Sequence, residues 1–361
     1  MAFSLPNTLK LAQLKQLAFK CGISTSGTKP ILTRRLLDDL ALLQPLQQPA
    51  KAGKQLWMGH KGERTRILSI DMGIRNLAYC MLDVPPRGGG LPCIHAWHRL
   101  AVSSAPVPSP DAAALDADAA LATAAAAAKE AFDPATLSAA AYALLRHRLL
   151  PLDPTHILIE RQRFRSMGSK HILEWTIRVN MFESILYAVL CTLREEGVWR
   201  GEVRSIAPGK VGPFWIGEEG AEAEAEAEDG VGDEVRPDSG VELEMEKGEE
   251  RGKSKKKIRR SQNAKIKNKG LKIDLVRSWL EGGDVVGFGN EQVESVARAY
   301  REKWDRAPGA RRGPRGRERE GEKMGKLDDM ADCLLQGMAW VQWEENKRAL
   351  VKNGVEALLE S

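Results

Sequence analysis

The first apolar pattern along the chain is helical. Within residues 5–41, two short segments repeat apolar residues at the spacing of a helix face. Gly22 is suited to the end of the first helix, because glycine adopts the left-handed backbone that often terminates one. Pro30 is suited to the first turn of the second helix. We therefore predict a small helical unit over residues 1–45, followed by a linker over residues 46–65 that contains Pro and Gly.

A series of short apolar runs follows and predicts strands. Three runs lie in succession at residues 67–71, 76–84 and 93–100, separated by turn residues, which favours an antiparallel meander. Two more, at residues 155–160 and 203–208, are separated by a long segment with helical periodicity. The pattern predicts an α/β fold with a mixed five-stranded sheet flanked by helices.

Helical periodicity returns between and after these strands, and two segments interrupt it. Residues 217–270 join an acidic low-complexity block to a Lys- and Arg-rich block, so we predict a disordered insertion there. Residues 306–323 are rich in Arg and Gly and predict a loop. The main domain would then comprise residues 66–216 and 271–347. Its helices are expected to start near residues 133, 170, 271, 293 and 328.

The charge of the chain is unevenly distributed. The formal net charge is +5, yet residues 218–250 contain 15 acidic and 2 basic residues, so the remainder carries +18. A body this basic favours a polyanionic partner, most often nucleic acid, over a merely Arg-rich surface. No stretch approaches about 18 uninterrupted apolar residues, so no membrane segment is expected. Five well-separated cysteines argue against a disulfide framework and for a reducing compartment.

Carboxylates stand at the ends of two predicted strands and at the start of the last helix. Asp71 and Glu160 each end an apolar strand, and their side chains would meet if both strands end at the same sheet edge. The last helix opens with Asp328, Asp329 and Asp332, whose spacings of three and four residues place Asp332 on a face with each of the others. Three separate elements could therefore bring acids to one cluster.

Such a cluster repels itself unless a cation neutralises it. Oxygen ligands with few competing imidazoles suit magnesium, with manganese as a substitute. A pair of such ions is a recurring device for phosphodiester cleavage. Each acid also has an ordinary structural explanation: Asp71 could be a turn residue, and Asp328 and Asp329 could complement the helix dipole. Glu160 is the hardest to explain in this way, because burying an unpaired carboxylate is costly.

Basic and amide side chains follow Glu160 directly. Arg161, Gln162, Arg163 and Arg165 lie next to the candidate ligand, and guanidinium groups match the geometry of phosphate. A solvated basic loop is the alternative, but a position beside the acid favours a contact with the substrate backbone. The further candidates for DNA binding are Arg75, Lys170, Lys29, Arg34 and Arg35.

Taken together, four segments resemble the fungal mitochondrial Holliday junction resolvases, which are cruciform-cutting endonucleases of the RNase H-like superfamily. The segments are SIDMGIRNLAY (69–79), ILIERQRFRS (157–166), KHILEWTIRVNMFESIL (170–186) and KLDDMADCLLQGMAW (326–340). Residues 5–41 separately resemble a SAP motif, which is a DNA-binding helix pair.

The resemblance implies an RNase H-like catalytic domain and a SAP-like unit at residues 1–45. The enzyme would be a magnesium-dependent crossover junction endodeoxyribonuclease, a homodimer that binds a DNA four-way junction and makes paired nicks during mitochondrial recombination. Its location would be mitochondrial, with the nucleus as the alternative, because residues 1–20 are basic but lack the Arg of cleavable presequences. The implied metal ligands are Asp71, Glu160, Asp329 and Asp332, with Asp328 as a neighbour or alternate.

Three other classes of function remain open from the sequence. An RNase H-like nuclease could act on another nucleic-acid structure, such as an RNA–DNA hybrid or a flap. A non-enzymatic SAP-type DNA-binding protein would have no need for acids at strand ends. The IDMG turn (70–73) also resembles the phosphate loop of actin-like kinases and ATPases, but we find no second Gly-rich phosphate loop, and such a fold leaves the DDMAD helix (328–332) unexplained.

Overall fold

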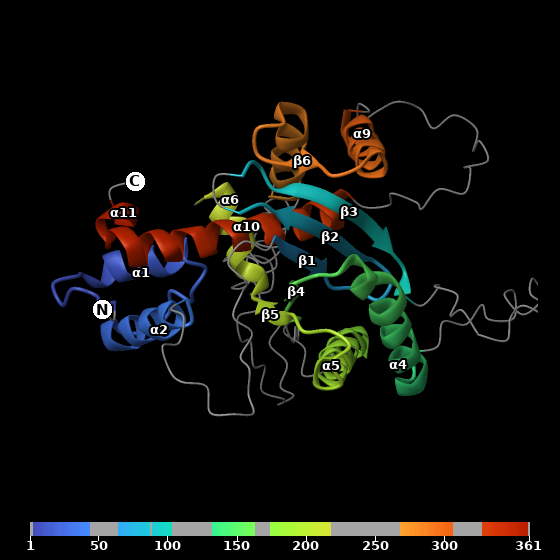
Figure 1. The fold of residues 1–361 in the computed structure, drawn as a ribbon, viewed down its shortest axis with the longest axis horizontal. Helices are drawn as coiled ribbons and strands as arrows, with labels where there is room; N and C mark the ends of the chain where they lie inside the picture. Colours follow the sequence, from blue (N-terminus) through green and yellow to red (C-terminus); the bar gives the residue numbers. More distant parts are fainter. Residues whose placement is uncertain are drawn as a thin grey trace, which may run out of the picture.

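The structure, a computed structural model, has a mixed sheet at its centre. It describes residues 3–43, 64–86, 89–102, 132–162, 174–217, 268–305 and 327–359. The sheet has six strands in the order β5-β4-β1-β2-β3-β6 (Figure 1). An antiparallel meander of three strands lies beside two strands that run parallel to the first. The strands are β1 (Thr65–Asp71), β2 (Leu77–Val84), β3 (Cys93–Leu100), β4 (His156–Glu160), β5 (Glu202–Ile206) and β6 (Gly287–Phe288).

The five strands predicted from the apolar pattern are confirmed, and the number of strands is corrected to six. The additional strand, β6, has only two residues and pairs in parallel with Cys93 and Ile94 of β3. A strand this short has no alternation for a sequence pattern to reveal.

Helices cover both faces of the sheet. Successive residues of β1 point to opposite faces, so Ile67 packs in one apolar cluster while Leu68 and Ile70 pack in the other. A strand buried on both faces must be apolar throughout, which explains its continuous run. One face holds α6 (Val211–Ile216), a helix over residues 268–282, α9 (Glu291–Asp305) and α10 (Leu327–Asn353). The other holds α4 (Pro134–Ala143), its π-helical continuation (Leu144–Leu149) and α5 (Glu174–Glu195).

The last long helix, α10, joins the sheet to the N-terminal helices. Its 27 residues correspond to about 40 Å of helix. It ends at Asn353, beyond the expected end of the domain at residue 347, because Leu350 is fully buried against the N-terminal unit and extends the packed part of the helix. Figure 1 shows one end of α10 against the sheet and the other beside α1 and α2.

The N-terminal unit consists of α1 (Leu11–Lys20) and α2 (Lys29–Ala41), as predicted from helical periodicity. Gly22 follows α1 with φ of 68°, the left-handed conformation expected there. The core of this unit also contains residues from the other end of the chain: Leu350 of α10, Val355, and Leu358 of α11 (Glu356–Leu359). Two short helices have too little apolar surface to enclose a core by themselves, so they share one with α10 and α11.

Several predicted segments lie outside the described residues. They are most of the 46–65 linker, nearly all of the 217–270 insertion and the whole 306–323 loop. Both boundaries of the insertion are described: Gly217 follows α6, and the helix expected at residue 271 already includes residues 268–270.

Among the described helices, α5 is long and apolar enough to meet the length and composition criterion for a membrane span. Its apolar content is accounted for in part by packing, because Phe182, Leu186 and Leu190 are buried against the sheet and α4. The helix also carries charged residues, among them Arg178 and Glu183.

Candidate metal centre

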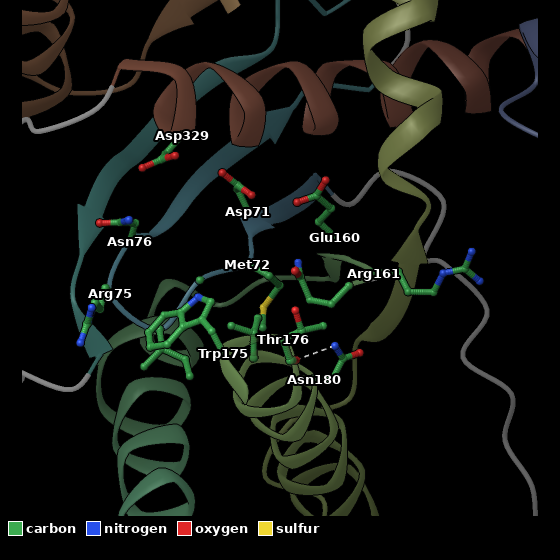
Figure 2. A pocket seen from close by; sticks show the side chains of 14 residues that line it. Asp71, Met72, Arg75, Asn76, Glu160, Arg161, Trp175, Thr176, Asn180 and Asp329 are labelled. Atoms are coloured by element: carbon green, nitrogen blue, oxygen red, sulfur yellow. Dashed lines mark hydrogen bonds between the residues drawn. The ribbon is translucent and has the colours of Figure 1, made fainter. Parts of the chain in front are cut away.

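Asp71 and Glu160 end neighbouring parallel strands at the same edge of the sheet. The register of β1 and β4 pairs Ile70 with Ile159, so the next residue of each strand is the acid. Both side chains line one cavity (Figure 2), and the charge of Glu160 raises the pKa of Asp71. The structure thus brings together the two acids that the strand pattern singled out.

The carboxyl group of Asp71 lies close to other acids, and its pKa reflects their negative charge. Burial raises the pKa of Asp71 well above its ordinary value, and the carboxylates of Glu160, Asp332 and Asp329 raise it further. Two neighbouring carboxylates repel each other when both are ionised, so ionising the pair is costly without a cation nearby. A bound cation would lower that cost.

The acids of α10 approach this pair, but each is held by a basic side chain. Nε of Arg99 on β3 lies 2.9 Å from Oδ2 of Asp329. Lys269 is bonded to Asp328, which raises the pKa of the lysine. Nζ of Lys272 lies 3.0 Å from Oδ1 of Asp332. All three acids predicted on this helix therefore have a cationic partner.

The structure separates these three acids by position. Asp329 lines the same cavity as Asp71 and Glu160. Asp332 does not line it, although it is close enough to raise the pKa of Asp71. Asp328 pairs with Lys269 on the helix over residues 268–282. Asp329 is therefore the acid of α10 placed best to act with the strand carboxylates.

The residues present fit a hard divalent cation by their chemistry. Within the described ranges, no three His, Cys, Asp or Glu side chains are grouped closely enough to enclose a metal ion. Two of the acids of α10 are instead paired with bases, Asp329 with Arg99 and Asp332 with Lys272. The donors around Asp71 are carboxylate oxygens, and their mutual repulsion is the property that an ion such as Mg²⁺ would relieve.

Two buried polar contacts set the position of α10 on the sheet. Nε2 of Gln336 donates to Oγ of Ser69 (3.0 Å) and to the carbonyl oxygen of Ile70 (3.2 Å), just before Asp71. Nε1 of Trp97 donates to the carbonyl oxygen of Met330, at 2.9 Å, beside the acids. These bonds hold the helix in register with the strand that carries Asp71. Sequence analysis missed Gln336, although a single amide within the apolar run LLQGMAW was a signal.

Replacing Gln336 with Met should destabilise the fold by roughly 1–3 kcal/mol. If the protein cuts DNA as its sequence predicts, the same change should slow that cleavage by about tenfold. Met fills a similar volume but cannot donate, so the helix loses its register and the buried acceptors lose their partner. Single-turnover cleavage and thermal unfolding measure the two effects. Gln342→Met is the control on the same helix, because its amide bonds only to Asn346 among the described residues. Equal rates in both variants would contradict the positioning role.

A second buried acid supports the loop after β4. Glu183 of α5 is 9% exposed and accepts a hydrogen bond from the backbone N–H of Gln162 at 2.9 Å. Burial raises its pKa, while the bond from Gln162 and the charge of Arg161 act in the opposite direction. This contact fixes the backbone immediately after Glu160. Helical periodicity placed residue 183 among the members of α5 without indicating this role.

The predicted DNA-binding side chains near the acids lie in different places. Arg75 and Arg161 both line the cavity, and Figure 2 shows them on opposite sides of it, with Arg161 directed away from the carboxylates. Gln162 lines the cavity and is anchored by Glu183. The other predicted residues of this group, Arg163, Arg165 and Lys170, lie outside the described residues.

The predicted basic residues of the N-terminal unit have structural contacts of their own. Nζ of Lys29 donates to the carbonyl oxygen of Asn7, at 2.8 Å. Arg35 donates to the carbonyl oxygens of Ser24 and Ser26, both at 2.9 Å. Arg34 is highly exposed and lies 3.8 Å from Asp38, a weak surface pair. Of these three, Arg34 is the most accessible to a phosphate.

Two curated proteins are similar in sequence to half of this chain. The chain is 30% identical over 182 residues to the mitochondrial cruciform cutting endonuclease 1 of Schizosaccharomyces pombe, covering 50% of this chain and 55% of that protein. It is 27% identical over 184 residues to the protein of the same name from Saccharomyces cerevisiae, covering 50% of this chain and 44% of that one. The chain thus spans about half the length of the curated relatives it matches.

A solved structure and a family model complete the comparison. The crystal structure of the yeast mitochondrial Holliday junction resolvase Ydc2 matches with a TM-score of 0.52 and 22% identity, covering 98% of this chain and all of that one. This likeness shows the fold, the RNase H-like architecture expected from the sequence. The model of the family described as mitochondrial resolvase Ydc2 / RNA splicing MRS1 matches residues 67–350. Because that range is more than half of its length, the chain belongs to the mitochondrial resolvase Ydc2 / RNA splicing MRS1 family.

Proposed function

We propose that the protein is a divalent-metal-dependent endonuclease that resolves four-way DNA junctions. The observation that carries the proposal is the pair of carboxylates Asp71 and Glu160, which end adjacent strands and line a cavity that Asp329 also lines. A passive DNA-binding protein has no need for such a pair, and the sequence lacks the second Gly-rich phosphate loop that an actin-like kinase requires. The names of the relatives, which describe cutting of cruciforms and resolution of Holliday junctions, support the choice of substrate.

Asp71, Glu160, Asp329 and Asp332 would hold the cation, with Mg²⁺ as the natural ion and Mn²⁺ as a substitute. When bound, such ions activate water and stabilise the departing 3′ oxygen. The positive charge of the cation would relieve the repulsion between Asp71 and Glu160. Arg99 and Lys272, released in part from the α10 acids, would remain next to the phosphodiester and offset its charge.

The symmetry of the substrate favours a homodimer. Resolution of a four-way junction requires one cut in each of two strands related by a two-fold axis. Within the described ranges, the chain has one cavity that combines Asp71 with Glu160. Two copies arranged about a two-fold axis would supply both cuts, and the two-fold dimer is the commonest oligomer.

Beyond the catalytic cavity, basic groups would hold the arms of the junction. Arg75 and Arg161 flank the carboxylates and would contact phosphates on either side of the cut. The N-terminal unit, proposed as SAP-like, would add contacts through Arg34, with Lys29 and Arg35 close by. Both curated relatives are named mitochondrial, which supports a role in recombination and repair of mitochondrial DNA and gives no support to the nuclear alternative.

A panel of labelled substrates tests this proposal. The purified protein is incubated with Mg²⁺ and a four-way DNA junction, a linear duplex of the same sequence, an RNA–DNA hybrid and a structured RNA. We expect cutting of the junction at least about a hundredfold faster than of the duplex, since the open junction is the proposed specific ligand. Preferred cutting of the hybrid would instead indicate another RNase H-like nuclease. Binding of the RNA without cutting of any substrate would indicate a non-enzymatic role, such as the RNA splicing named in the family description.

A further inference from the structure

The cavity beside the carboxylates has a second wall whose chemistry differs from that of a metal site. Its volume is about 330 Å³, and its far side is formed by the first two turns of α5. Trp175, Thr176 and Asn180 on these turns lie opposite Asp71 and Glu160 (Figure 2). This wall offers an indole and an amide in place of carboxylates, so the cavity is larger and more varied than metal ligation requires.

Trp175 is exposed and yet held firmly. Its side chain is 39% exposed, although large apolar side chains gain most when buried. The Arg75 guanidinium lies 4.8 Å from the centre of the indole, and the ring of Phe132 meets the indole edge-on at 5.4 Å. Arg178 lies over Phe132 at 4.4 Å and is paired with Glu174. An exposed indole fixed by such contacts is a preorganised stacking surface.

Two amides in the cavity have orientations set by their neighbours. Nδ2 of Asn180 donates to the carbonyl oxygen of Thr176 at 2.8 Å, which fixes the orientation of the amide. Its Oδ1 accepts no hydrogen bond within the part of the chain that the structure describes. Arg99 can only donate, so it must bond to Oδ1 of Asn76, which leaves Nδ2 of Asn76 as a donor. Asn180 and Asn76 therefore offer an acceptor and a donor to the cavity beside the indole.

We propose that this cavity binds an unstacked DNA base from a nucleotide adjacent to the cut phosphate. The base would stack on Trp175, and Asn76 and Asn180 would bond to the donors and acceptors on its edge. A flat heterocycle with a π face and polar edges matches these three groups, and stacking on an aromatic side chain is the usual way to hold a base outside its helix. The inference rests on the proposed function, and it makes cleavage depend on the base at that position.

The dependence of cleavage on the base beside the cut can be measured on a four-way junction whose branch point migrates through several different base steps. Cut positions are mapped in Mg²⁺ under single-turnover conditions for the wild type, Trp175→Ala, Trp175→Phe and the control Tyr142→Ala. Tyr142 is an aromatic residue of α4 that is 45% exposed and does not line the cavity. We expect Trp175→Ala to reduce the ratio between the fastest and slowest positions by about tenfold, Trp175→Phe to retain most of it, and the control to match the wild type.

A binding readout keeps the test independent of chemistry. The fluorescent base 2-aminopurine is placed on either side of the cut in a junction bound in Ca²⁺. At one position, wild-type protein should change its emission, Trp175→Ala should abolish that change, and Tyr142→Ala should leave it intact. If the wild type cuts junctions but neither its site preference nor the 2-aminopurine signal depends on Trp175, the base-binding inference is overturned and the proposed function stands. If the wild type cuts no junction, the proposed function itself fails.

Discussion

Asp71→Asn is expected to abolish junction cleavage, by roughly 10³-fold or more, while affinity for the junction in Ca²⁺ stays within about threefold. The carboxylate acts on the proposed metal rather than on the position of the DNA, and Asn cannot replace a charged oxygen donor. Glu160→Gln should behave in the same way, because Glu160 ends the adjacent strand and lines the same cavity as Asp71. Single-turnover cleavage and filter binding measure the two quantities. Full cleavage by either variant would contradict the assignment.

Asp71→Asn should also make the metal-free protein more stable at neutral pH. The pKa of Asp71 is raised above its ordinary 3.8 by burial and neighbouring acids. A carboxyl group whose pKa is higher in the folded than in the unfolded state destabilises the folded protein as the pH rises from the unfolded-state pKa through the folded-state pKa. The difference in melting temperature between Asp71→Asn and the wild type, measured in chelator, should therefore widen as pH rises over that window. Mg²⁺ should then raise the melting temperature of the wild type more than that of the variant.

Asp83→Asn is a matched control for the stability effect. Asp83 on β2 is buried, but it faces Arg64 at 3.4 Å and His95 at 3.5 Å instead of other acids. Its neutralisation removes favourable pairs and should lower the melting temperature without changing cleavage. If both substitutions shift the melting temperature in the same direction, the charge environment inferred for Asp71 is wrong.

The second large effect is expected at Gly22, where the N-terminal unit meets α10. A Cβ atom at this glycine would lie 2.2 Å from Cδ2 of Trp343, and the residue has φ of 68°. Gly22→Ala should therefore destabilise the protein by several kcal/mol, of which roughly 1–2 kcal/mol come from the left-handed backbone. The contact with Trp343 accounts for the remainder. Denaturant unfolding measures the total.

Gly197→Ala separates the two contributions. Gly197 has nearly the same backbone conformation, with φ of 73°, but no atom within 4 Å of a Cβ built there. It should show only the backbone part of the loss. Combining Gly22→Ala with Trp343→Phe should give less destabilisation than the sum of the single substitutions, because the smaller ring leaves room for the new methyl group. Equal losses at Gly22 and Gly197 would contradict close docking of the N-terminal unit on α10.

Docking at Gly22 also bears on DNA binding. If the N-terminal unit carries phosphate contacts as proposed, its displacement in Gly22→Ala should weaken junction affinity and flatten the dependence on salt, because fewer counterions are released. Cleavage of junctions already bound should change little, since Asp71 and Glu160 lie on strands that Gly22 does not contact.

The strands and their terminal acids could be predicted because the evidence for them is local. A strand buried on both faces is a continuous apolar run, and an acid at its end interrupts that run visibly, as at Asp71 and Glu160. Parallel pairing of β1 and β4 then brings the two acids to one edge. The start of α10 was predictable for the same reason, since Asp328 and Asp329 open its apolar pattern.

The features that sequence analysis missed depend on contacts between distant parts of the chain. Arg99 pairs with Asp329, 230 positions away, and no local pattern connects them. The shared core of the N-terminal unit joins Leu17 to Leu358 from opposite ends of the chain. Trp175 reads as an ordinary member of a helix, and only its place in the cavity distinguishes it.

The central claim is that the protein resolves four-way junctions only with a suitable divalent metal ion, and cleavage started by adding the metal tests it most directly. A four-way junction labelled on all strands is bound to the wild-type protein in Ca²⁺, excess Mg²⁺ is added, and both opposed strands are followed in a single turnover. The account predicts no product in Ca²⁺ or chelator, and paired nicks in two opposed strands after Mg²⁺ is added, giving duplexes that a ligase can seal. Cutting in chelator, or a bound junction that stays intact after Mg²⁺ is added, would contradict it.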